Sequence, residues 1–149
     1  MISIALAGES NSQDVLPLMQ AYHEFEGISL TDAERESALR PLLGKSPLGG
    51  VWLVWSGNGC IGYLIACFGY SVEFCGRDAF VDEFFIQEAY RGQGIGRQLL
   101  LRVQTEMRAL NIRALHLEVA HNNDNARHLY VEAGFSGRQQ FMLMSCKLF

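Results

Sequence analysis

The run Arg91-Gly92-Gln93-Gly94-Ile95-Gly96 constrains the fold of this chain more than any other feature of the sequence. An apolar segment, residues 79–86, precedes it, and a long amphipathic segment, residues 97–110, follows it. A strand that turns through glycines into a helix directs several free backbone N–H groups to one point, where the helix dipole also favours negative charge. The sequence therefore predicts a strand–loop–helix unit that binds a phosphorylated cofactor.

The spacing of the glycines argues against two common phosphate-binding loops. A dinucleotide fingerprint, G-x-G-x-x-G, would need a glycine where Arg97 or Leu99 stands. A P-loop needs lysine and then serine or threonine after its last glycine, but Arg97 and Gln98 follow Gly96. The remaining pattern is R-x-x-G-x-G, in which Arg91 is a permanent cation and the glycines allow phosphate oxygens to approach the backbone.

Length and composition fit one domain over residues 1–149, since 49% of the residues are hydrophobic and 19% are charged. The net charge of −4 gives no basic footprint, so no nucleic-acid partner is expected. No signal peptide and no apolar run of about eighteen residues occurs, which predicts a cytoplasmic protein without a membrane partner. The cysteines form no C-x-x-C pair and are expected to be small buried hydrophobes, so no metal is expected.

Hydrophobic periodicity predicts alternating strands and helices. Strands are expected at residues 2–6, 51–55, 60–70, 79–86, 114–119 and 141–148, with turns at 57–59 and 76–78. Four helices are expected. The first covers residues 13–24, and the second begins at a capping box at 31–34 and ends before Gly44. The third follows the glycine-rich loop, and the fourth covers residues 123–133. In the third of these helices, the face ending in Met107 and Leu110 is expected to pack on the sheet.

The loop and the second half of the chain resemble the GCN5-related N-acetyltransferase family. The acetyl-CoA pyrophosphate loop of that family carries Q/R-x-x-G-x-G/A after a strand, matched here by Arg91, Gly94 and Gly96. Downstream, the segments EV at 118–119, NxxA at 123–126 and LYxxxGF at 129–135 also resemble it. The resemblance covers nearly the whole chain. It implies an α/β fold whose central twisted mixed sheet of six to seven strands is flanked by about four helices.

An N-acetyltransferase needs a base for the amine and an acid for the departing thiolate. An alkylamine has a pKa near ~10.4, so holding it deprotonated near neutral pH costs about 4 kcal/mol. Asp82 and Glu83 are adjacent on a predicted strand, so only one should face a given cleft, where apolar neighbours would raise its pKa. The resemblance implies that Asp82 is the base, directly or through water, that Glu83 positions the amine, and that Tyr130 is the general acid. From the residues alone, the acids could instead be solvated and Tyr130 could be a core residue.

The resemblance also implies acetyl-CoA as the co-substrate, with pantetheine lying between the splayed fourth and fifth strands. Direct transfer in a ternary complex follows from it, because no cysteine stands where a covalent acetyl carrier is expected. Asn123 is expected both to cap a helix and to contact pantetheine. The residues expected at the cofactor are Phe85, Ile86, Gln87, Arg91, Gly92, Gln93, Gly94, Ile95, Gly96, Arg97 and Asn123.

The acceptor is expected to be a small cationic amine, an aminoglycoside or a peptide or protein amine, because acidic residues crowd the segment 78–88. A non-catalytic acyl-CoA-binding sensor is the main alternative, since it would keep the loop but tolerate loss of Asp82 and Tyr130. A nucleotide-dependent oxidoreductase is a second alternative. The family is frequently dimeric, and the apolar segment 141–144 could supply the contact strand of a homodimer.

Overall fold

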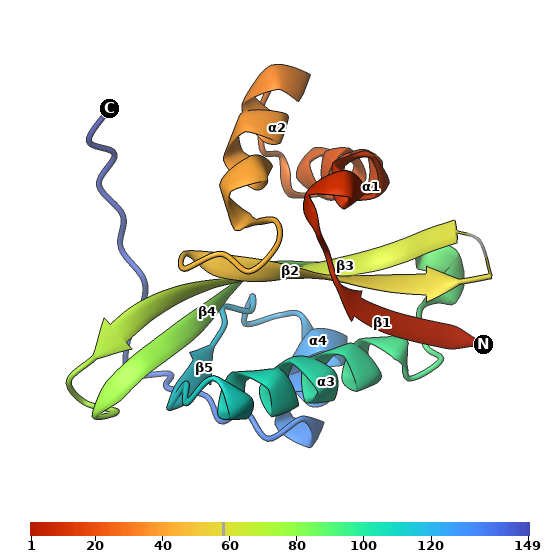
Figure 1. Cartoon of the computed structure of the whole chain (residues 1–149). Coiled ribbons are helices and arrows are strands. Elements are labelled where there is room, and N and C mark those ends of the chain that lie inside the picture. Colours follow the sequence, from red (N-terminus) through yellow and green to blue (C-terminus); the bar gives the residue numbers. More distant parts are fainter. Residues whose placement is uncertain (58) are drawn as a thin grey trace.

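A five-stranded sheet with helices on both faces forms the body of the computed structural model, which describes residues 1–57 and 59–149 (Figure 1). In order across the sheet, the strands are β1 (Ile2–Leu6), β2 (Gly49–Ser56), β3 (Gly59–Ser71), β4 (Gly76–Ile86) and β5 (Ala114–His116). The first four strands pair antiparallel, whereas β5 pairs with β4 in parallel. The expected mixed α/β class is confirmed, but the sheet has five strands over the described residues and not six to seven.

The helices divide between the two faces of the sheet (Figure 1). On one face lie α1 (Ser12–Glu26) and α2 (Asp32–Leu39), and on the other lie α3 (Ile95–Ala109) and α4 (Asp124–Glu132). Three short 3₁₀ turns, η1 (Glu9–Asn11), η2 (Arg40–Leu42) and η3 (Glu88–Tyr90), connect these elements.

Strand β2 lies in the interior of the sheet, and both of its faces are covered. Val51 and Leu53 belong to the core cluster under α1 and α2, while Trp52 and Val54 belong to the cluster under α3. Alternation along a strand sends neighbouring side chains to opposite faces, so a continuous apolar run fits a strand buried on both sides. The sheet is therefore the partition between two hydrophobic cores.

Helix α3 packs on the sheet through the apolar stripe that its sequence predicts. Ile95, Leu99, Val103 and Met107 are all buried, whereas Leu110 is 50% exposed because the helix ends at Ala109. The expected packing is thus confirmed for the stripe except at Leu110. The indole Nε1 of Trp52 donates to the Oε2 of Glu106 at 2.7 Å, which fixes the helix to β2.

Helix α2 begins as predicted and ends earlier. The Thr31 hydroxyl accepts from the Glu34 N–H at 3.1 Å, and the Glu34 carboxylate accepts from the Thr31 N–H at 2.7 Å, forming a capping box. The α-helix stops at Leu39 and continues as η2, not as one helix up to Gly44. Pro41 has no N–H for a helical hydrogen bond, which explains the early end.

Two expected turns and one strand differ from the structure. The β3–β4 turn lies at residues 72–75, and not at 76–78, because Cys75 adopts the positive φ of 61° that reverses the chain. The predicted turn at 57–59 includes residue 58, which lies outside the described residues. Strand β5 ends at His116, and not at residue 119.

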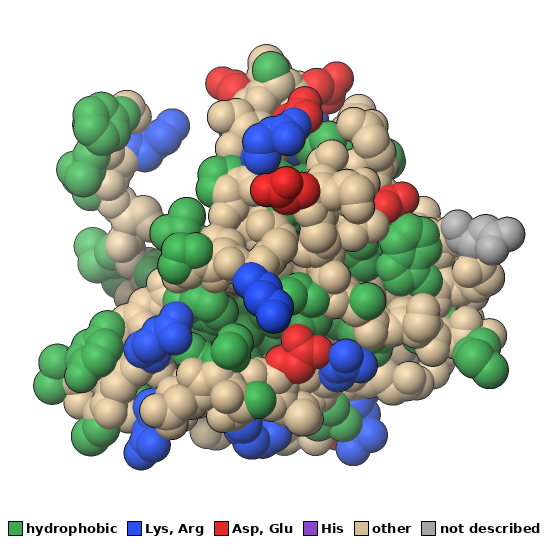
Figure 2. Space-filling view, viewed as in Figure 1, with side chains coloured by type: hydrophobic (Ala, Val, Ile, Leu, Met, Phe, Trp, Pro, Cys, Tyr) green, Lys and Arg blue, Asp and Glu red, His purple; other side chains and the backbone are tan. Residues whose placement is uncertain are grey.

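The expected strand at 141–148 is not formed. Residues 141–149 extend away from the body, and Figure 2 shows their hydrophobic side chains uncovered. Strand β5 is only three residues long, so its outer edge offers few backbone groups to which this segment could hydrogen-bond. Cys75 and Cys146 are exposed, and only Cys60 and Cys67 are half-buried, so the expectation of four buried cysteines is wrong.

Candidate functional site

The glycine-rich loop joins the end of β4 to the start of α3. Gly92 and Gly94 have φ values of 75° and 79°, in the left-handed region that disfavours side chains. Gly94 is the N-cap of α3, and no side chain caps the first turn of the helix. The N–H groups of Ile95, Gly96 and Arg97 are therefore among the donors that a helix start leaves free for an anion.

Gly96 is explained by packing. A Cβ at this position would lie 3.2 Å from the Cζ of Phe84 and 3.4 Å from the Cδ2 of Leu129. The absence of a side chain thus lets the start of α3 approach β4 and α4 closely. Gly94, in contrast, has no atom within 4 Å of the position that a Cβ would occupy, so its backbone faces open space.

Arg91 connects the loop to the end of β4. Its Nε donates to the backbone oxygen of Ile86 at 2.7 Å, and its guanidinium carbon lies 5.4 Å from the centre of the Phe85 ring. Gln93 donates from its side chain to the backbone oxygen of Ala89 at 3.3 Å. These contacts tie the loop to the end of β4 and to η3.

Strand β5 pairs with only part of the length of β4. Their registered pairs are Asp78 with Ala114, Ala79 with Leu115 and Phe80 with His116. Beyond Phe80, β4 continues to Ile86 while pairing only with β3. Over the described residues, β4 therefore has no second strand partner from residue 81 to residue 86, which leaves that edge of the strand open, and the splay that the resemblance implies stays a prediction.

A β-bulge separates the two acidic residues of β4. Ile65 pairs with Glu83 and Ala66 pairs with Val81, so Asp82 is an extra residue in the ladder. The bulge resets the alternation, which places Val81 in the core under α3 and Phe85 against the core under α1. Simple alternation from the sequence could not predict this arrangement.

Asp82 and Glu83 have opposite environments. Asp82 is exposed, so the desolvation expected around it is not found, and its carboxylate makes no hydrogen bond to the described residues. The side chain of Glu83 is only 12% exposed. Its Oε2 lies 2.7 Å from the Nε2 of His23, and its Oε1 accepts from the Tyr63 hydroxyl at 2.8 Å.

Two tyrosines, Tyr63 and Tyr22, lie close enough to Glu83 for its charge to affect the pKa of their phenols. Burial raises the pKa of Tyr22 to about 12, with smaller contributions from Glu26, Glu83 and Asp82. Burial, followed by the charge of Glu83, also raises the pKa of Tyr63 far above its ordinary value. The Tyr22 ring meets Tyr63 and Phe85 edge-on, with centroids 6.4 Å and 6.1 Å away. Both phenols therefore stay protonated near neutral pH.

Tyr130 lies on α4 and is half-buried against the core under α3. Its ring centroid lies 6.3 Å from that of Phe84 and 6.0 Å from that of Phe135. Burial raises the pKa of Tyr130, and the charge of Glu26 adds to the effect. Tyr130 is thus a packing residue whose phenol lies close enough to Glu26 to sense its charge.

Asn123 caps α4, as the sequence predicts. Its Oδ1 accepts from the Ala126 N–H at 3.2 Å. Gly134 follows the end of this helix with a φ of 96°, in the left-handed conformation expected of a glycine stop.

Four residues of this region were not predicted from the sequence as site residues: Tyr22, His23, Arg35 and Tyr63. A signal for His23 exists, because Val15, Met19 and His23 stand four positions apart on the buried stripe of α1. A polar residue on such a stripe must find a buried partner, but the sequence does not say which.

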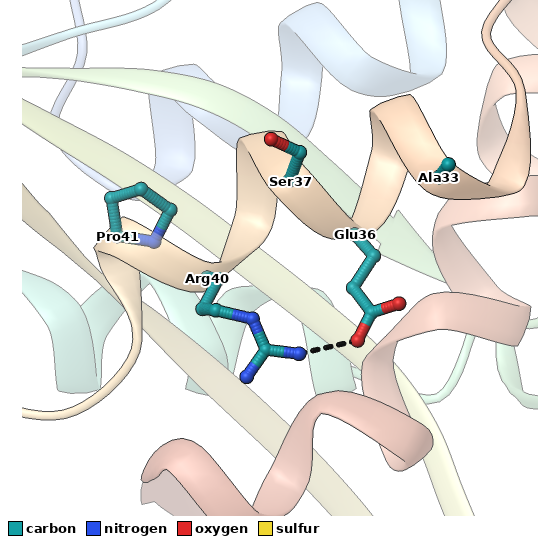
Figure 3. A pocket seen from close by; sticks show the side chains of 5 residues that line it. All are labelled: Ala33, Glu36, Ser37, Arg40 and Pro41. Atoms are coloured by element: carbon teal, nitrogen blue, oxygen red, sulfur yellow. Dashed lines mark hydrogen bonds and ion pairs between the residues drawn. The ribbon is translucent and has the colours of Figure 1, made fainter.

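The surface hollow drawn in Figure 3 lies apart from these residues. Ala33, Glu36, Ser37, Arg40 and Pro41 line it, and an ion pair joins Arg40 to Glu36 across one helical turn. It contains none of the candidate residues.

Within residues 1–57 and 59–149, no cluster of three or more histidine, cysteine or acidic side chains could hold a metal ion. Over the same residues, no helix has the length and apolar character to cross a membrane.

A sequence model for the acetyltransferase (GNAT) family matches residues 15–135. An uncharacterized N-acetyltransferase from Bacillus subtilis (strain 168), YycN, is 38% identical over 72 residues, covering 48% of this chain and 45% of that protein. The chain spans about half the length of the curated relatives that it matches.

Solved structures share the whole fold. An integron cassette protein, HFX_CASS3, from the mobile metagenome of Cole Harbour Salt Marsh is 30% identical with a TM-score of 0.86, covering 98% of this chain and 90% of that one. An aminoglycoside antibiotic 6′-N-acetyltransferase from Acinetobacter baumannii has a TM-score of 0.78 and 18% identity, covering 100% of both chains. This second likeness shows the fold alone.

Proposed function

Since the chain belongs to the acetyltransferase (GNAT) family, we propose that it transfers an acetyl group from acetyl-CoA directly to a primary amine in a ternary complex. The junction between β4 and α3 carries the proposal. There the open edge of β4 leads into a loop at which the first N–H groups of α3 have no side-chain cap. An extended arm that ends in a diphosphate suits these two features together.

Acetyl-CoA fits the residues at this junction, and when bound it supplies an acetyl group activated as a thioester. The backbone of Phe85, Ile86 and Gln87 would hold the pantetheine arm, and Asn123 would contact it from α4. The N–H groups of residues 93–97 would hold the pyrophosphate, with the Arg91 cation and Gly92 beside them. The open space over Gly94 is the observation that supports this fit.

The acid pair and Tyr130 have the properties that proton transfer requires. Asp82 is the proposed base, because its carboxylate is exposed and makes no bond to the described residues. Glu83 is the proposed positioning group for the amine, because two donors hold it in place. Tyr130 is the proposed acid for the thiolate, because a phenol is protonated at neutral pH and can donate its proton, and burial raises the pKa of this one.

A cationic amine is the proposed class of acceptor. Asp82, Glu83 and Glu26 all lie near enough to Tyr22 for their charges to raise the pKa of its phenol, so three carboxylates converge on one region. Aminoglycosides and polyamines carry positive charges that would be attracted to these carboxylates. One structural neighbour is by name an aminoglycoside acetyltransferase.

A homodimer formed through the C-terminal segment is the proposed assembly. Phe141, Met142, Leu143 and Met144 are between 62% and 81% exposed, which is an unusual run of apolar side chains to leave in water. Pairing with a second copy would cover them.

The test is thiol release from acetyl-CoA across panels of polyamines, aminoglycosides, amino acids and short peptides. Turnover with at least one cationic amine supports the proposal. Tight binding of acetyl-CoA by calorimetry with no turnover in any panel would replace it with the non-catalytic sensor. Stabilisation by NAD but not by acetyl-CoA would indicate an oxidoreductase instead.

A further inference from the structure

A chain of buried polar groups runs from the candidate site into α1 and α2. It starts at Glu83, whose Oε2 lies 2.7 Å from the Nε2 of His23, a residue that is 1% exposed. It continues to Arg35, which is 6% exposed and whose Nε lies 3.2 Å from the Nδ1 of His23. It ends at the surface, where Arg35 pairs at 3.0 Å with Asp32, whose side chain is 93% exposed.

Arg35 determines which imidazole nitrogen carries the proton. The guanidinium group can only donate, so the Nδ1 of His23 must present its lone pair to it. The ring proton therefore lies on Nε2, which donates it to the Oε2 of Glu83. This assignment follows from the hydrogen-bond partners of the ring.

Arg35 itself is held by three different acceptors. Besides His23 and Asp32, it donates to the backbone oxygen of Leu30 at 3.0 Å. The guanidinium plane is thus fixed by contacts from α1, from α2 and from the segment that joins them. A side chain held in this way transmits its geometry to the ring beside it.

Packing alone does not explain these residues. His23 stands on the buried stripe of α1 with Val15 and Met19, where an apolar side chain would fill the same space without losing hydration. A buried guanidinium is also costly, and apolar replacement of buried ionic groups is often neutral or stabilising. The group that this chain of hydrogen bonds fixes in place is the carboxylate of Glu83.

We infer that Arg35 and His23 are positioning residues that orient the ionised Glu83 carboxylate toward the amine substrate. The inference rests on the proposed function, in which Glu83 positions that amine. Tyr63 holds the other carboxylate oxygen, so the two donors together fix the rotation of the group. The connection between α1 and α2 is thereby coupled to the site through Arg35.

Paired substitutions at position 23 test the inference. Glutamine can accept from Arg35 and donate to Glu83, as the imidazole does, whereas leucine only fills the space. We expect His23→Leu to raise KM for the amine that turns over fastest in the panel by about tenfold or more, with KM for acetyl-CoA unchanged. His23→Gln should restore most of the loss. Equal amine KM in the wild type and in His23→Leu would overturn the inference.

Heteronuclear NMR of the imidazole nitrogens provides a readout that needs neither turnover nor a folded variant at position 23. In the wild type, Nε2 of His23 should carry the proton and Nδ1 should not. In Arg35→Met, the Nδ1 resonance should shift because its hydrogen-bond donor is removed, while Nε2 keeps the proton that Glu83 accepts. A wild-type ring protonated on Nδ1 would overturn the inference, even if the protein acetylates amines. A failure of acetyl transfer in every panel would instead overturn the proposed function.

Discussion

Phe80 and His116 form the last registered pair between β4 and β5, and β4 extends beyond it to Ile86 with one edge open. The open edge ends at the loop before α3, so an extended ligand lying along it would reach the free N–H groups of the helix. The end of β5 at His116 thus exposes the edge of β4 that leads to the start of α3, although β5 follows both elements in the sequence.

Gly94→Ala tests the loop. An alanine at a φ of 79° is strained by about 1–2 kcal/mol, and relief of this strain would turn the first N–H groups of α3. We expect acetyl-CoA affinity to fall about tenfold by calorimetry. Gly44→Ala is the matched control, because Gly44 has a φ of 77° and equally open surroundings outside the loop. It should lose similar stability and keep its affinity. Equal affinity in both variants would contradict the placement of the pyrophosphate.

Asp82→Asn should lower kcat with little effect on stability, whereas Glu83→Gln should lower the free energy of unfolding. Asp82 is exposed and makes no bond to the described residues, so its amide should change the free energy of unfolding by less than about 0.5 kcal/mol but lower kcat by about a hundredfold. In Glu83→Gln, an amide NH₂ must face either His23 or Tyr63, both of which donate. This variant should lose about 1–3 kcal/mol in urea denaturation. Full kcat in Asp82→Asn would exclude Asp82 as the base.

Tyr130→Phe tests the general acid. Removal of the hydroxyl should lower kcat by about a hundredfold, with the packing against Phe84 and Phe135 kept. Because burial raises the pKa of Tyr130, any alkaline loss of kcat from its ionisation should occur at a higher pH than an ordinary tyrosine would give. Tyr90→Phe is the control, since Tyr90 packs against the same core. Equal kcat for Tyr130→Phe and wild type would return Tyr130 to a packing role.

Tyr22 predicts a loss of stability at alkaline pH. Its pKa is about 12 in the folded state and about 10 when unfolded, so the unfolded chain releases its proton first. The stabilisation is fully present below pH ~10 and is lost as pH rises toward 12. Urea denaturation across this range should show a shallower decline in Tyr22→Phe than in the wild type. Tyr70→Phe, at a residue that is 74% exposed, should follow the wild type. An unchanged slope in Tyr22→Phe would show that Tyr22 titrates normally in the folded protein.

The C-terminal segment predicts self-association. Sedimentation should give a dimer for the wild type and a monomer for the double variant Phe141→Ser and Leu143→Ser, because both side chains are more than half exposed in one copy. A matched double variant at exposed polar positions, Gln139→Ser and Gln140→Ser, should remain dimeric. A monomeric wild type would leave the segment without this role.

Local patterns determined much of the fold in advance. The apolar stripe of α3 up to Met107, the capping box at Thr31 and the cap at Asn123 stand as predicted, because each depends on residue types at spacings of about one helical turn. The β4–loop–α3 unit follows from the spacing of the glycines for the same reason.

Only some residues of the candidate site could be predicted from the sequence. The acid pair and Tyr130 could be named, but alternation along β4 failed at Asp82, because a bulge depends on how β3 and β4 pair. The predicted strand at 141–148 failed for a related reason. An apolar segment becomes a strand only where a sheet edge offers partners, and the segment stands away from the body.

The sequence by itself thus determined the glycine-rich loop before α3 and the family to which the chain belongs, because both depend on residue types at short fixed spacings. Only the tertiary structure decided that His23 would meet Glu83, 60 positions away, and that Arg35 would donate a hydrogen bond to its ring. The physical reason is that hydrogen-bond partners between α1, α2 and β4 follow from how the helices cross the sheet, which no local periodicity encodes.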